Sequence, residues 1–323
     1  IYGGYLALIG DITLGRFVAF NQYINMLVWP MLACGDSVNM FSQGAASIRR
    51  IQEIFKEQPE IADTDKTKEV KKGEIEFNHL TFIHRGHSEP TLNDITLHVP
   101  AGTTLAIIGR TGNGKSTLVN LLLHLYNTKP GMLFIDGKDI NTIPLKTLRE
   151  NIGYVPQDNF LFSDTLKSNI AFGAENEDME AIQSATRAAC IHENIVQFPD
   201  GYETIVGERG VTLSGGQKQR ICIARALLKK PAVLILDDST SAVDTATDAK
   251  IRAAFQKCIP GTTKIIIAQR VSSVQDADRI VVLDDGRING VGTHDELVAN
   301  NEIYRDIYES QTKDGGDFDR PQN

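Results

Sequence analysis

Hydrophobic and polar positions divide the chain into two parts with different patterns. In the first part, Ile1–Gly10 is apolar apart from tyrosine hydroxyls, and after a short polar break Phe17–Gly35 runs for nineteen residues without a charge. That length is close to what a helix needs to cross the hydrocarbon core of a bilayer, which is roughly 30 Å thick. From Glu74 onward, short apolar runs alternate with amphipathic stretches. This alternation predicts an α/β domain with a largely parallel sheet.

The second part contains runs whose length and period distinguish strands from helices. Apolar runs of strand length lie at Leu105–Gly109, Ile152–Val155, Val233–Asp237, Lys264–Ala268 and Arg279–Asp284. Helices are predicted between several of them by amphipathic stretches at Thr117–Tyr126, Met179–Ala189 and Gln217–Leu228. Thr293 and Glu296 have the spacing of a capping box and predict the start of a last helix.

The charge-free run near the N-terminus carries polar residues that a lipid-facing helix would leave unpaired. Asn21, Gln22 and Asn25 lie within it, together with Pro30. Such residues suit a membrane helix with one face on a bundle interior, where polar groups find partners. Three basic residues follow at Arg49, Arg50 and Lys56. They predict a cytoplasmic C-terminal end, since Lys and Arg concentrate on that side. A buried helix of a soluble protein is the alternative.

Composition marks the boundaries between these parts. Residues 58–73 are polar and charged with one proline, which predicts a solvated connector. We therefore expect a membrane segment over residues 1–57, a linker over 58–73 and one globular domain over 74–310. Residues 311–323 are polar and rich in Gly and Asp, which predicts a tail without fixed structure. Because the sequence begins at Ile1 rather than Met, we interpret it as a fragment of a longer protein.

Composition and charge narrow the classes of function. The chain has 323 residues, of which 41% are hydrophobic and 23% charged, values typical of a protein with a substantial core. The formal net charge of −8 argues against a nucleic-acid partner, because nucleic-acid-binding proteins usually carry a basic face. The four cysteines form no CxxC pair, which argues against a zinc site or a disulfide framework and fits a reducing compartment.

A glycine-rich loop follows the first apolar run of the globular part. Residues 109–116 read G-x-x-x-x-G-K-S, and the apolar run Leu118–Leu125 comes after them. Strand, loop and helix in this order predict a P-loop, whose backbone N–H groups and helix N-terminus hold phosphate. The candidate phosphate-binding residues are Gly109, Arg110, Thr111, Gly112, Asn113, Gly114, Lys115, Ser116 and Thr117. We expect Lys115 at the β- and γ-phosphates and the Ser116 hydroxyl on Mg²⁺. A chance glycine-rich turn is the alternative, and a P-loop alone leaves kinases and GTPases open.

Two carboxylates end a later apolar strand. The run Val233–Leu236 is followed by Asp237 and Asp238. A carboxylate at the end of a strand beside a P-loop is positioned to bind Mg²⁺ directly or through water. We assign this role to Asp237. The alternative is an ordinary acidic turn.

The segment before the acidic strand resembles a motif of a known family. Residues 213–217 read LSGGQ, continue as KQR, and stand between the glycine-rich loop and the acidic strand. They resemble the signature motif of the ATP-binding cassette (ABC) proteins. A serine and two glycines at a helix start form a nest for an anion. The resemblance implies that this nest serves the ATP bound by the opposite subunit. Its candidate binding residues are Ser214, Gly215, Gly216 and Gln217.

Three further motifs extend the resemblance over residues 74 to about 310. Val155–Asp158 resembles the Q-loop, Gly207–Gly210 the X-loop of exporters, and Ser241–Asp244 the D-loop. The resemblance implies that Gln157 senses Mg²⁺ and contacts the membrane domain, and that Asp244 belongs to the nucleotide site. It implies a P-loop NTPase cassette with ATP and Mg²⁺ as cofactors. The expected fold combines a largely parallel core sheet, an antiparallel β subdomain and a helical signature subdomain.

The N-terminal part also resembles a piece of an exporter. Ile12–Gly15, Phe20, Pro30 and Ala46–Ile51 are similar to the last two membrane helices of a fused exporter half. This implies the remnant of an all-α transmembrane domain in a multi-pass protein of the cell membrane, with the cassette on the cytoplasmic side. Partners would be the lipid bilayer and an exported substrate that the cassette sequence does not encode. Soluble cassette proteins and importers fit less well, because they do not place such a segment before the cassette.

Three positions depart from the family pattern. The residue after the Mg²⁺ aspartate is usually glutamate, the catalytic base, and here it is Asp238. The strand at residue 264 usually leads into a histidine at the γ-phosphate, and here it leads into Gln269. The aromatic ring on adenine is usually tyrosine, and here His84 follows Phe82 at that spacing. A histidine ring can still stack on a base. An exposed loop histidine without a role is the alternative for His84.

Asp238 and Gln269 together predict a site that binds ATP and hydrolyses it slowly. This resembles the degenerate-site subunit of a heterodimeric multidrug-type exporter. The intact signature would then serve a competent site on a second ABC half-transporter with Glu and His at the two altered positions. A regulatory subunit that never hydrolyses ATP and a homodimer that works with Asp and Gln remain as alternatives. A third is a soluble cassette protein in which Phe17–Gly35 is a core helix.

Overall fold

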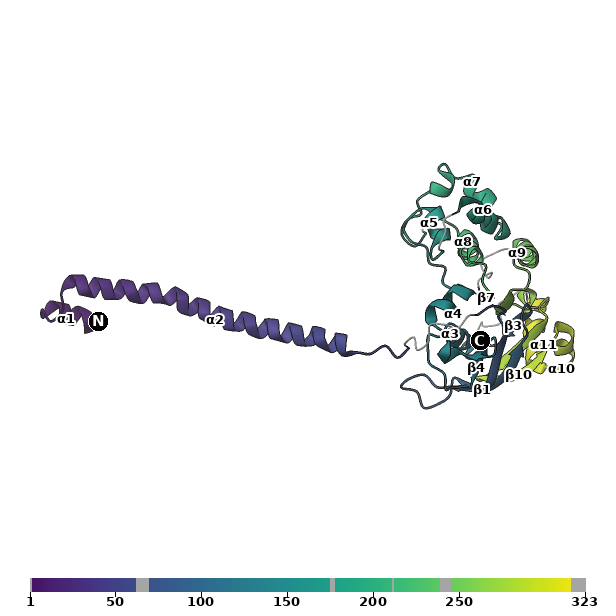
Figure 1. Ribbon diagram of the computed structural model, residues 1–323, viewed down its shortest axis with the longest axis horizontal. Coiled ribbons are helices and arrows are strands. Elements are labelled where there is room, and N and C mark those ends of the chain that lie inside the picture. Colours follow the sequence, from purple (N-terminus) through teal and green to yellow (C-terminus); the bar gives the residue numbers. More distant parts are fainter. Residues whose placement is uncertain (1, 62–69, 175–177, 211, 239–244, 315–323) are drawn as a thin grey trace. The chain divides into compact units, whose positions relative to one another are not determined.

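The computed structural model describes residues 2–61, 70–174, 178–210, 212–238 and 245–314. The chain divides into two compact units, Ile1–Pro59 and Glu60–Asn323 (Figure 1). The predicted D-loop, including Asp244, lies outside the described residues.

The first unit consists of helix α1, Tyr2–Leu8, and the 43-residue helix α2, Leu14–Lys56. Thr13 begins α2 by accepting a hydrogen bond from the backbone N of Arg16 at 3.3 Å. Helix α2 is longer than the charge-free run that predicted it. Pro30 lies inside the helix, which continues through the basic residues near its end. At about 1.5 Å per residue, α2 is roughly 65 Å long and therefore exceeds the thickness of a bilayer core.

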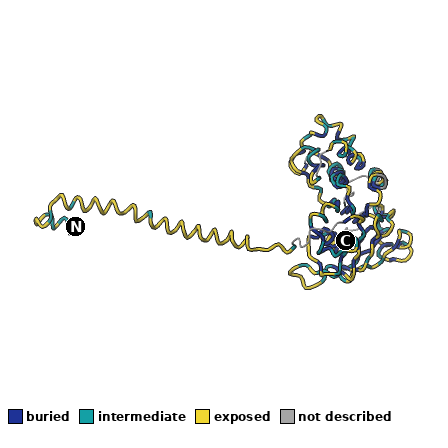
Figure 2. The backbone as a smooth tube through the Cα atoms, viewed as in Figure 1, coloured by how far each residue is buried: buried dark blue, intermediate teal, exposed yellow. Residues whose placement is uncertain are grey.

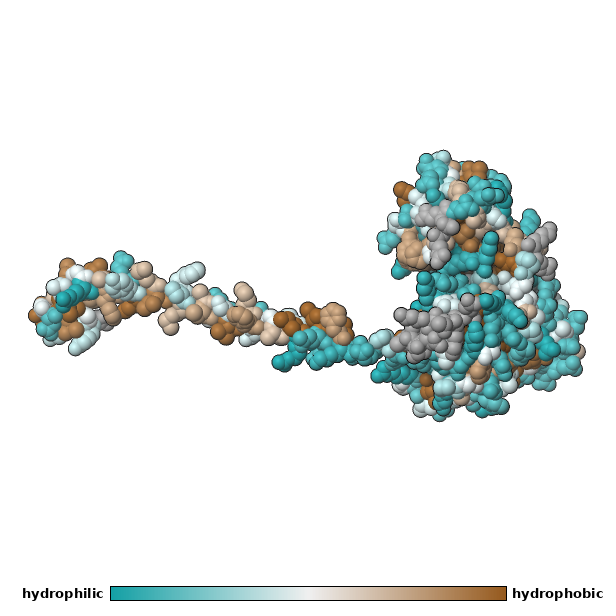
Figure 3. All heavy atoms as spheres, in the orientation of Figure 1, coloured by the Kyte–Doolittle hydropathy of each residue, from teal (hydrophilic) through white to brown (hydrophobic). Residues whose placement is uncertain are grey.

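Helix α2 exposes its apolar side chains within its own unit. An 18-residue window has a mean hydropathy of 1.2, so by length and composition α2 can cross a membrane. None of its residues, all of which the structure describes, is buried. Figure 2 shows the exposed helix, and Figure 3 shows apolar residues along it. Trp29 is 76% exposed and Phe41 is 82% exposed, so the helix presents large apolar rings at its surface.

The second unit is built on a six-stranded sheet in the order β10-β9-β3-β8-β7-β6. Its strands are β3 (Thr104–Ile108), β6 (Ile152–Val155), β7 (Val233–Asp237), β8 (Thr263–Ile267), β9 (Arg279–Asp284) and β10 (Arg287–Gly292). The pairs β9–β3, β3–β8, β8–β7 and β7–β6 are parallel, and β10 is antiparallel to β9. All five predicted strands are therefore confirmed within one residue.

A smaller antiparallel sheet has the order β2-β1-β4-β5. Its strands are β1 (Ile75–Phe82), β2 (Leu92–Val99), β4 (Leu133–Ile135) and β5 (Lys138–Asp139). The α-helices of the second unit are α3 (Lys115–Leu122), α4 (Leu145–Asn151), α5 (Leu166–Ala171), α6 (Met179–Ala188), α7 (His192–Val196), α8 (Gly215–Leu228), α9 (Thr245–Cys258), α10 (His294–Asn300) and α11 (Glu302–Asp314). Short 3₁₀ turns are η1 (Ile140–Thr142), η2 (Gly201–Glu203), η3 (Glu208–Gly210) and η4 (Val271–Ser273). Helices α5 to α8 gather into one helical part between β6 and β7 in the chain (Figure 1). The predicted α/β fold, with parallel and antiparallel sheets and a helical part, is confirmed.

Alternate residues of the core strands face two different hydrophobic cores. Leu105 and Ile107 of β3 pack with the antiparallel sheet, whereas Ala106 and Ile108 pack with residues of the helical part and of α11. Side chains alternate across a strand, so a sheet covered on both faces needs strands that are apolar at every position. This explains why the sequence shows continuous apolar runs here.

Three helix boundaries differ from or refine the predictions. Helix α3 ends at Leu122, four residues before the predicted end at Tyr126, because His124 has a φ of 48° that a helix cannot accept. The capping box of α10 is confirmed, since Thr293 and Glu296 each accept a backbone hydrogen bond from the other. Helix α11 continues to Asp314, so residues 311–314 are helical and not part of an unstructured tail.

Candidate functional site

Four neighbouring parallel strands bring the predicted site residues to one edge of the sheet. Strands β3, β8, β7 and β6 are adjacent in that order. Ile267 of β8 pairs with Ile107 of β3 and with Asp237 of β7, so these three strands end at the same level. The loops that follow them carry the glycine-rich segment, Gln269, and Asp238. Gln157 follows β6 in the same way.

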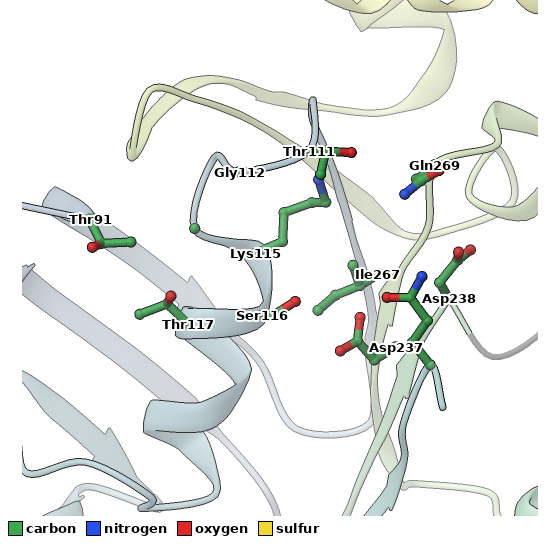
Figure 4. Close-up of a pocket in the computed structure, with 12 residues that line it drawn as sticks. Thr91, Thr111, Gly112, Lys115, Ser116, Thr117, Asp237, Asp238, Ile267 and Gln269 are labelled. Atoms are coloured by element: carbon green, nitrogen blue, oxygen red, sulfur yellow. The ribbon is translucent and has the colours of Figure 1, made fainter. Parts of the chain in front are cut away.

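These loops line a pocket of about 200 Å³. Its lining residues are Thr91, Thr111, Gly112, Gly114, Lys115, Ser116, Thr117, Gln157, Asp237, Asp238, Ile267 and Gln269. Figure 4 shows the side chains of Lys115 and Ser116 from one side, with Asp237, Asp238 and Gln269 opposite them. Ten of these lining residues were predicted from the sequence as site residues, and the structure adds Thr91 and Ile267.

Close backbone contacts hold the glycine-rich loop in place. Gly114 has a φ of 88°, and a Cβ there would lie 2.8 Å from the carbonyl oxygen of Thr91. A Cβ on Gly109 would collide with the carbonyl oxygen of Leu283. The Asn113 side-chain amide donates hydrogen bonds at 3.1 Å to that same carbonyl and to the Asp284 carboxylate. The loop is therefore fixed between the start of β2 and the end of β9.

Lys115 points into the loop that precedes it. Its Nζ donates hydrogen bonds to the carbonyl oxygens of Gly109 at 2.6 Å and Arg110 at 2.8 Å, and the residue is only 8% exposed. Lys115 is also the first residue of α3, whose leading N–H groups lack intrahelical partners. The ammonium and the positive end of the helix dipole act together at this edge of the pocket.

Asp237 is a buried carboxylate at the end of β7. It is 6% exposed, and burial raises its pKa above the usual range for aspartate. The Tyr154 hydroxyl and the Lys115 ammonium act in the opposite direction and lower that pKa. The Tyr154 hydroxyl donates to Asp237 Oδ2 at 3.4 Å, and burial raises the pKa of Tyr154 to about 12. Tyr154 therefore remains a hydrogen-bond donor at any physiological pH.

Asp238 follows with an unusual backbone conformation. Its φ is 45°, and its backbone N donates to the carbonyl oxygen of Ile267 at 2.8 Å. This bond extends the pairing of β7 with β8 by one residue. It also ties Asp238 to the strand that leads into Gln269.

His84 lies next to the pocket rather than in its lining. Its Nε2 is 3.2 Å from the Thr117 hydroxyl oxygen. Its ring centroid is 4.9 Å from that of Phe82 and 5.1 Å from that of Tyr126, both in edge-on arrangements. His84 is half-buried, and its ring centroid is also 6.3 Å from that of His87. Thr117 connects this ring to helix α3 and hence to the glycine-rich loop.

The predicted signature residues form the start of α8. The Ser214 hydroxyl accepts a hydrogen bond from the backbone N of Gln217 at 3.3 Å, and Gln217 Oε1 accepts one from the backbone N of Ser214 at 2.9 Å. This reciprocal capping box begins the helix. Among the described residues that line the pocket, none belongs to Ser214–Gln217.

Sequence reasoning missed Thr91, Ile267 and Tyr154. Thr91 precedes β2 in a loop without a motif, and it reaches the pocket because its carbonyl touches Gly114. Tyr154 is two residues before the Q-loop proline and 83 residues from Asp237. The signal for it is a tyrosine on a strand that ends beside the acidic strand, and that signal depends on the strand order, which the sequence does not give.

The segment that contains the glycine-rich loop, the signature residues and the acidic strand matches the sequence model of a known protein family. The ABC transporter family model matches residues 92–241. The chain therefore contains an ABC transporter ATP-binding domain. The matched residues include the glycine-rich loop, Gln157, the signature segment and both aspartates at the end of β7.

Two curated relatives are similar to the cassette and to the segment before it. The chain is 43% identical over 311 residues to the probable multidrug resistance ABC transporter ATP-binding/permease protein YheI of Bacillus subtilis, a match that covers 96% of this chain and 53% of that protein. It is 39% identical over 315 residues to the ATP-dependent lipid A-core flippase of Syntrophus aciditrophicus, covering 97% of this chain and 52% of that protein. The chain spans about half the length of these relatives.

A solved structure shows the same fold. The structure of a bacterial Atm1-family ABC exporter with ATP bound matches with a TM-score of 0.82 and 35% identity, covering 94% of this chain and 54% of that one. Because 94% of this chain is covered, the match includes at least part of helix α2 as well as the cassette. The cassette is thus homologous to those of ABC exporters.

Proposed function

We propose that this chain is the ATP-binding and ATP-hydrolysing part of an ABC exporter, in which paired cassettes use MgATP to drive transport across a membrane. The observation that carries the proposal is the pocket in which Lys115, Ser116, Asp237 and Gln269 lie together. Homology to exporters over 96% of the chain supports the step from nucleotide binding to transport. Because the chain spans about half of these relatives, export by the complete protein is part of the proposal.

The chemistry of the pocket fits a triphosphate and its magnesium ion. Lys115 supplies positive charge, and the backbone of residues 109–117 supplies N–H groups at the start of α3. Ser116, Asp237 and Gln157 offer oxygen atoms, which are the ligands that Mg²⁺ prefers. When bound, Mg²⁺ would neutralise charge on the phosphate oxygens. We assign His84 to the adenine ring, on which its half-buried imidazole would stack.

The two altered residues predict slow hydrolysis at this site. Asp238 would activate the attacking water, but its side chain is one methylene shorter than glutamate, which draws the carboxylate back by about 1.5 Å. A misplacement of about 1 Å can cost roughly 10²-fold in rate. The Gln269 amide can donate a hydrogen bond to the γ-phosphate, yet it cannot carry positive charge or transfer a proton near neutral pH. We therefore expect this site to retain ATP binding and to hydrolyse ATP slowly.

The start of α8 would serve a second nucleotide, held by another cassette. Ser214 caps the helix start, and the N–H groups of Gly215 and Gly216 belong to the first turn, where an anion can bind. We propose that they act on the partner's ATP, and that Asp244 contributes to the same interface. The partner is a second ABC half-transporter with Glu and His at the positions of Asp238 and Gln269, which makes the complete exporter a heterodimer.

Helix α2 supports a membrane location. Its exposed apolar side chains fit lipid and other membrane helices. Arg49, Arg50 and Lys56 near its C-terminal end favour the cytoplasmic side for that end and for the cassette that follows. We propose a multi-pass protein of the cell membrane with a cytoplasmic cassette.

The test is ATP turnover by this chain, alone and with its candidate partner, comparing wild type with Asp238→Glu plus Gln269→His. We expect low turnover alone, high turnover with the partner, and a gain of about 10-fold to 10²-fold alone from the double change. Lys115→Ala added to the double change should abolish the gain. Asp295→Glu, an exposed substitution of the same kind on α10, is the matched control and should leave turnover unchanged.

Other outcomes would favour one of the alternatives. Robust turnover without a partner, unchanged by the two substitutions, would favour a homodimer that works with Asp and Gln. No turnover by this site in any complex, together with tight ATP binding, would favour a regulatory subunit. Asp238 and Gln269, next to an otherwise complete phosphate site, are the observation that makes the regulatory function a second candidate.

A further inference from the structure

The last helix of the chain reaches the pocket through one side chain. Gln311 lies near the end of α11, and its Nε2 donates a hydrogen bond to the backbone carbonyl oxygen of Gln269 at 2.7 Å. Its Oε1 accepts a hydrogen bond from the backbone N of Val271 at 2.8 Å. One amide group therefore satisfies both backbone groups that flank Arg270.

This pairing is the one that a neighbouring β-strand would make. In a parallel pair, one residue donates its N–H to the carbonyl that precedes a residue of the neighbouring strand and accepts a hydrogen bond from the N–H that follows that residue. Here the Gln311 amide replaces that residue just beyond the end of β8, where the strand pairing stops. The chain at Gln269 is held as if the strand continued. Gln269 lines the pocket (Figure 4), so this contact holds the backbone that carries one of the pocket side chains.

Helix α11 is a firm support for Gln311. Tyr304 and Ile307 are 0% and 1% exposed, and both belong to the core that contains Val271. Residues three, four and seven apart share one face of a helix, so Gln311 extends the face of Tyr304 and Ile307. The Tyr304 hydroxyl oxygen is also 2.8 Å from Nδ1 of His294 on α10. Any shift of α11 would therefore move Gln311 and the backbone of Gln269 together.

We propose that Gln311 is a positioning residue that sets the direction of the Gln269 side chain and thereby the preference of the pocket for ATP over ADP. This rests on the proposed function, in which Gln269 meets the γ-phosphate. ADP lacks that phosphate, so a loss of positioning weakens ATP binding selectively. Arg270, the one residue between Gln269 and Val271, needs no role in this effect.

The first variant is Gln311→Glu, which keeps the size of the side chain. It keeps an acceptor for the Val271 N–H, but it removes the donor and places an oxygen against the Gln269 carbonyl. One lost hydrogen bond corresponds to roughly five- to tenfold in a binding constant. We expect affinity for a non-hydrolysable MgATP analogue to fall by that factor and affinity for MgADP to stay the same, both measured by calorimetry on the full chain.

A double variant tests whether Gln311 acts through Gln269. Gln269→Ala should itself reduce the ATP preference, and Gln311→Glu added to it should cause no further loss. Gln311→Met, which removes both hydrogen bonds at similar volume, should reproduce the selective loss. Thr312→Ala changes the exposed neighbour on the same helix and is the control for effects on α11 alone.

The outcomes separate the two proposals. If Gln269→Ala reduces the ATP preference and both Gln311 variants leave it intact, the positioning role is wrong and the function of Gln269 stands. If Gln311 variants weaken ATP and ADP equally, the contact is merely structural and the proposal is also wrong. If Gln269→Ala has no effect on the preference, the proposed role of Gln269 at the γ-phosphate fails, and the role of Gln311 fails with it.

Discussion

The hydrogen bond between Tyr154 and Asp237 offers a sharp test of the magnesium assignment. Tyr154→Phe removes the hydroxyl and keeps the ring that packs beside β7. The Tyr154 hydroxyl lowers the pKa of Asp237, whereas burial raises it. Without the hydroxyl, the pKa of Asp237 rises further, so the carboxylate is protonated at a higher pH than in the wild type. Protons then compete more strongly with Mg²⁺ for this side chain.

The expected size of the effect on Mg²⁺ affinity follows from the length of the hydrogen bond between Tyr154 and Asp237. At 3.4 Å it is longer than a typical O–H···O bond, so it should contribute about 0.5 to 1 kcal/mol. That free energy corresponds to a roughly two- to fivefold higher Mg²⁺ concentration for half-maximal ATP binding. The ratio between variant and wild type should increase as the pH falls, because the proton is the competitor. The pKa of Tyr154, about 12, keeps the wild-type donor intact throughout this range.

The assay is a titration of ATP binding with Mg²⁺ at several pH values between about 6 and 8. Tyr308→Phe is the matched control, since it removes a tyrosine hydroxyl from α11 outside the pocket lining. An Mg²⁺ requirement equal to that of the wild type at every pH would refute the link between Tyr154 and Asp237. A larger requirement with no pH dependence would show that the hydroxyl orients Asp237 without changing its protonation.

Three further substitutions test the scaffold of the site. Gly114→Ala should abolish nucleotide binding, measured by calorimetry, because the residue has a φ of 88° and its Cβ would meet the Thr91 carbonyl at 2.8 Å. Arg225→Met should lower the free energy of unfolding in urea by about 1 to 3 kcal/mol, since Arg225 donates to the Asn169 carbonyl at 2.7 Å. Burial alone would raise the pKa of Asp136, but backbone N–H groups of Lys72, Lys71, Glu74 and Gly73 outweigh it and lower the pKa. That stabilisation is present above the unfolded pKa and is lost as the pH falls through the lowered value, so Asp136→Asn should cost about 1 kcal/mol at pH 7 and less below about pH 4, measured by urea unfolding.

Features that depend on neighbours in the chain could be predicted from the sequence. The strands β3, β6, β7, β8 and β9 were predicted within one residue, because their apolar runs are continuous. The phosphate loop was predicted because its glycines and Lys115 stand in a fixed spacing. The capping box of α10 was predicted because both of its residues lie within four positions.

Features that depend on distant contacts could not be predicted in the same way. Helix α3 ends early at Leu122, because His124 has a backbone conformation that no local sequence pattern predicts. The charge-free run Phe17–Gly35 covers only part of α2. Charged residues disfavour insertion into a membrane, but they do not end a helix, so α2 continues beyond the run. Gln311 was assigned to an unstructured tail, yet its contact with Gln269 joins residues 42 apart in the chain. A polar C-terminal segment is expected to be disordered only when its side chains make no hydrogen bonds to the rest of the protein, and Gln311 makes two.

The strand order adds one expectation about the two altered residues. Strand β8 lies between β3 and β7, so Gln269 follows a strand that pairs with the one carrying Asp238. The backbone N of Asp238 bonds to the Ile267 carbonyl, two residues before Gln269. Both side chains line the same pocket, where they can share water and charge, so their effects on turnover should not add. In the Gln269→His variant, the new imidazole would lie beside the short Asp238 side chain, which holds the attacking water poorly. In the Asp238→Glu variant, the longer carboxylate would be present without a positive charge at position 269.

We therefore expect the double substitution to raise ATP turnover by more than the product of the two single effects. The cycle needs four proteins: wild type, Asp238→Glu, Gln269→His and the double variant, each assayed for turnover at saturating MgATP. Single effects that multiply to the double effect would mean that the two positions act independently, in spite of their adjacent strands. In that case the paired departure from the family pattern would reflect two separate losses, and the explanation by a shared catalytic geometry would be wrong.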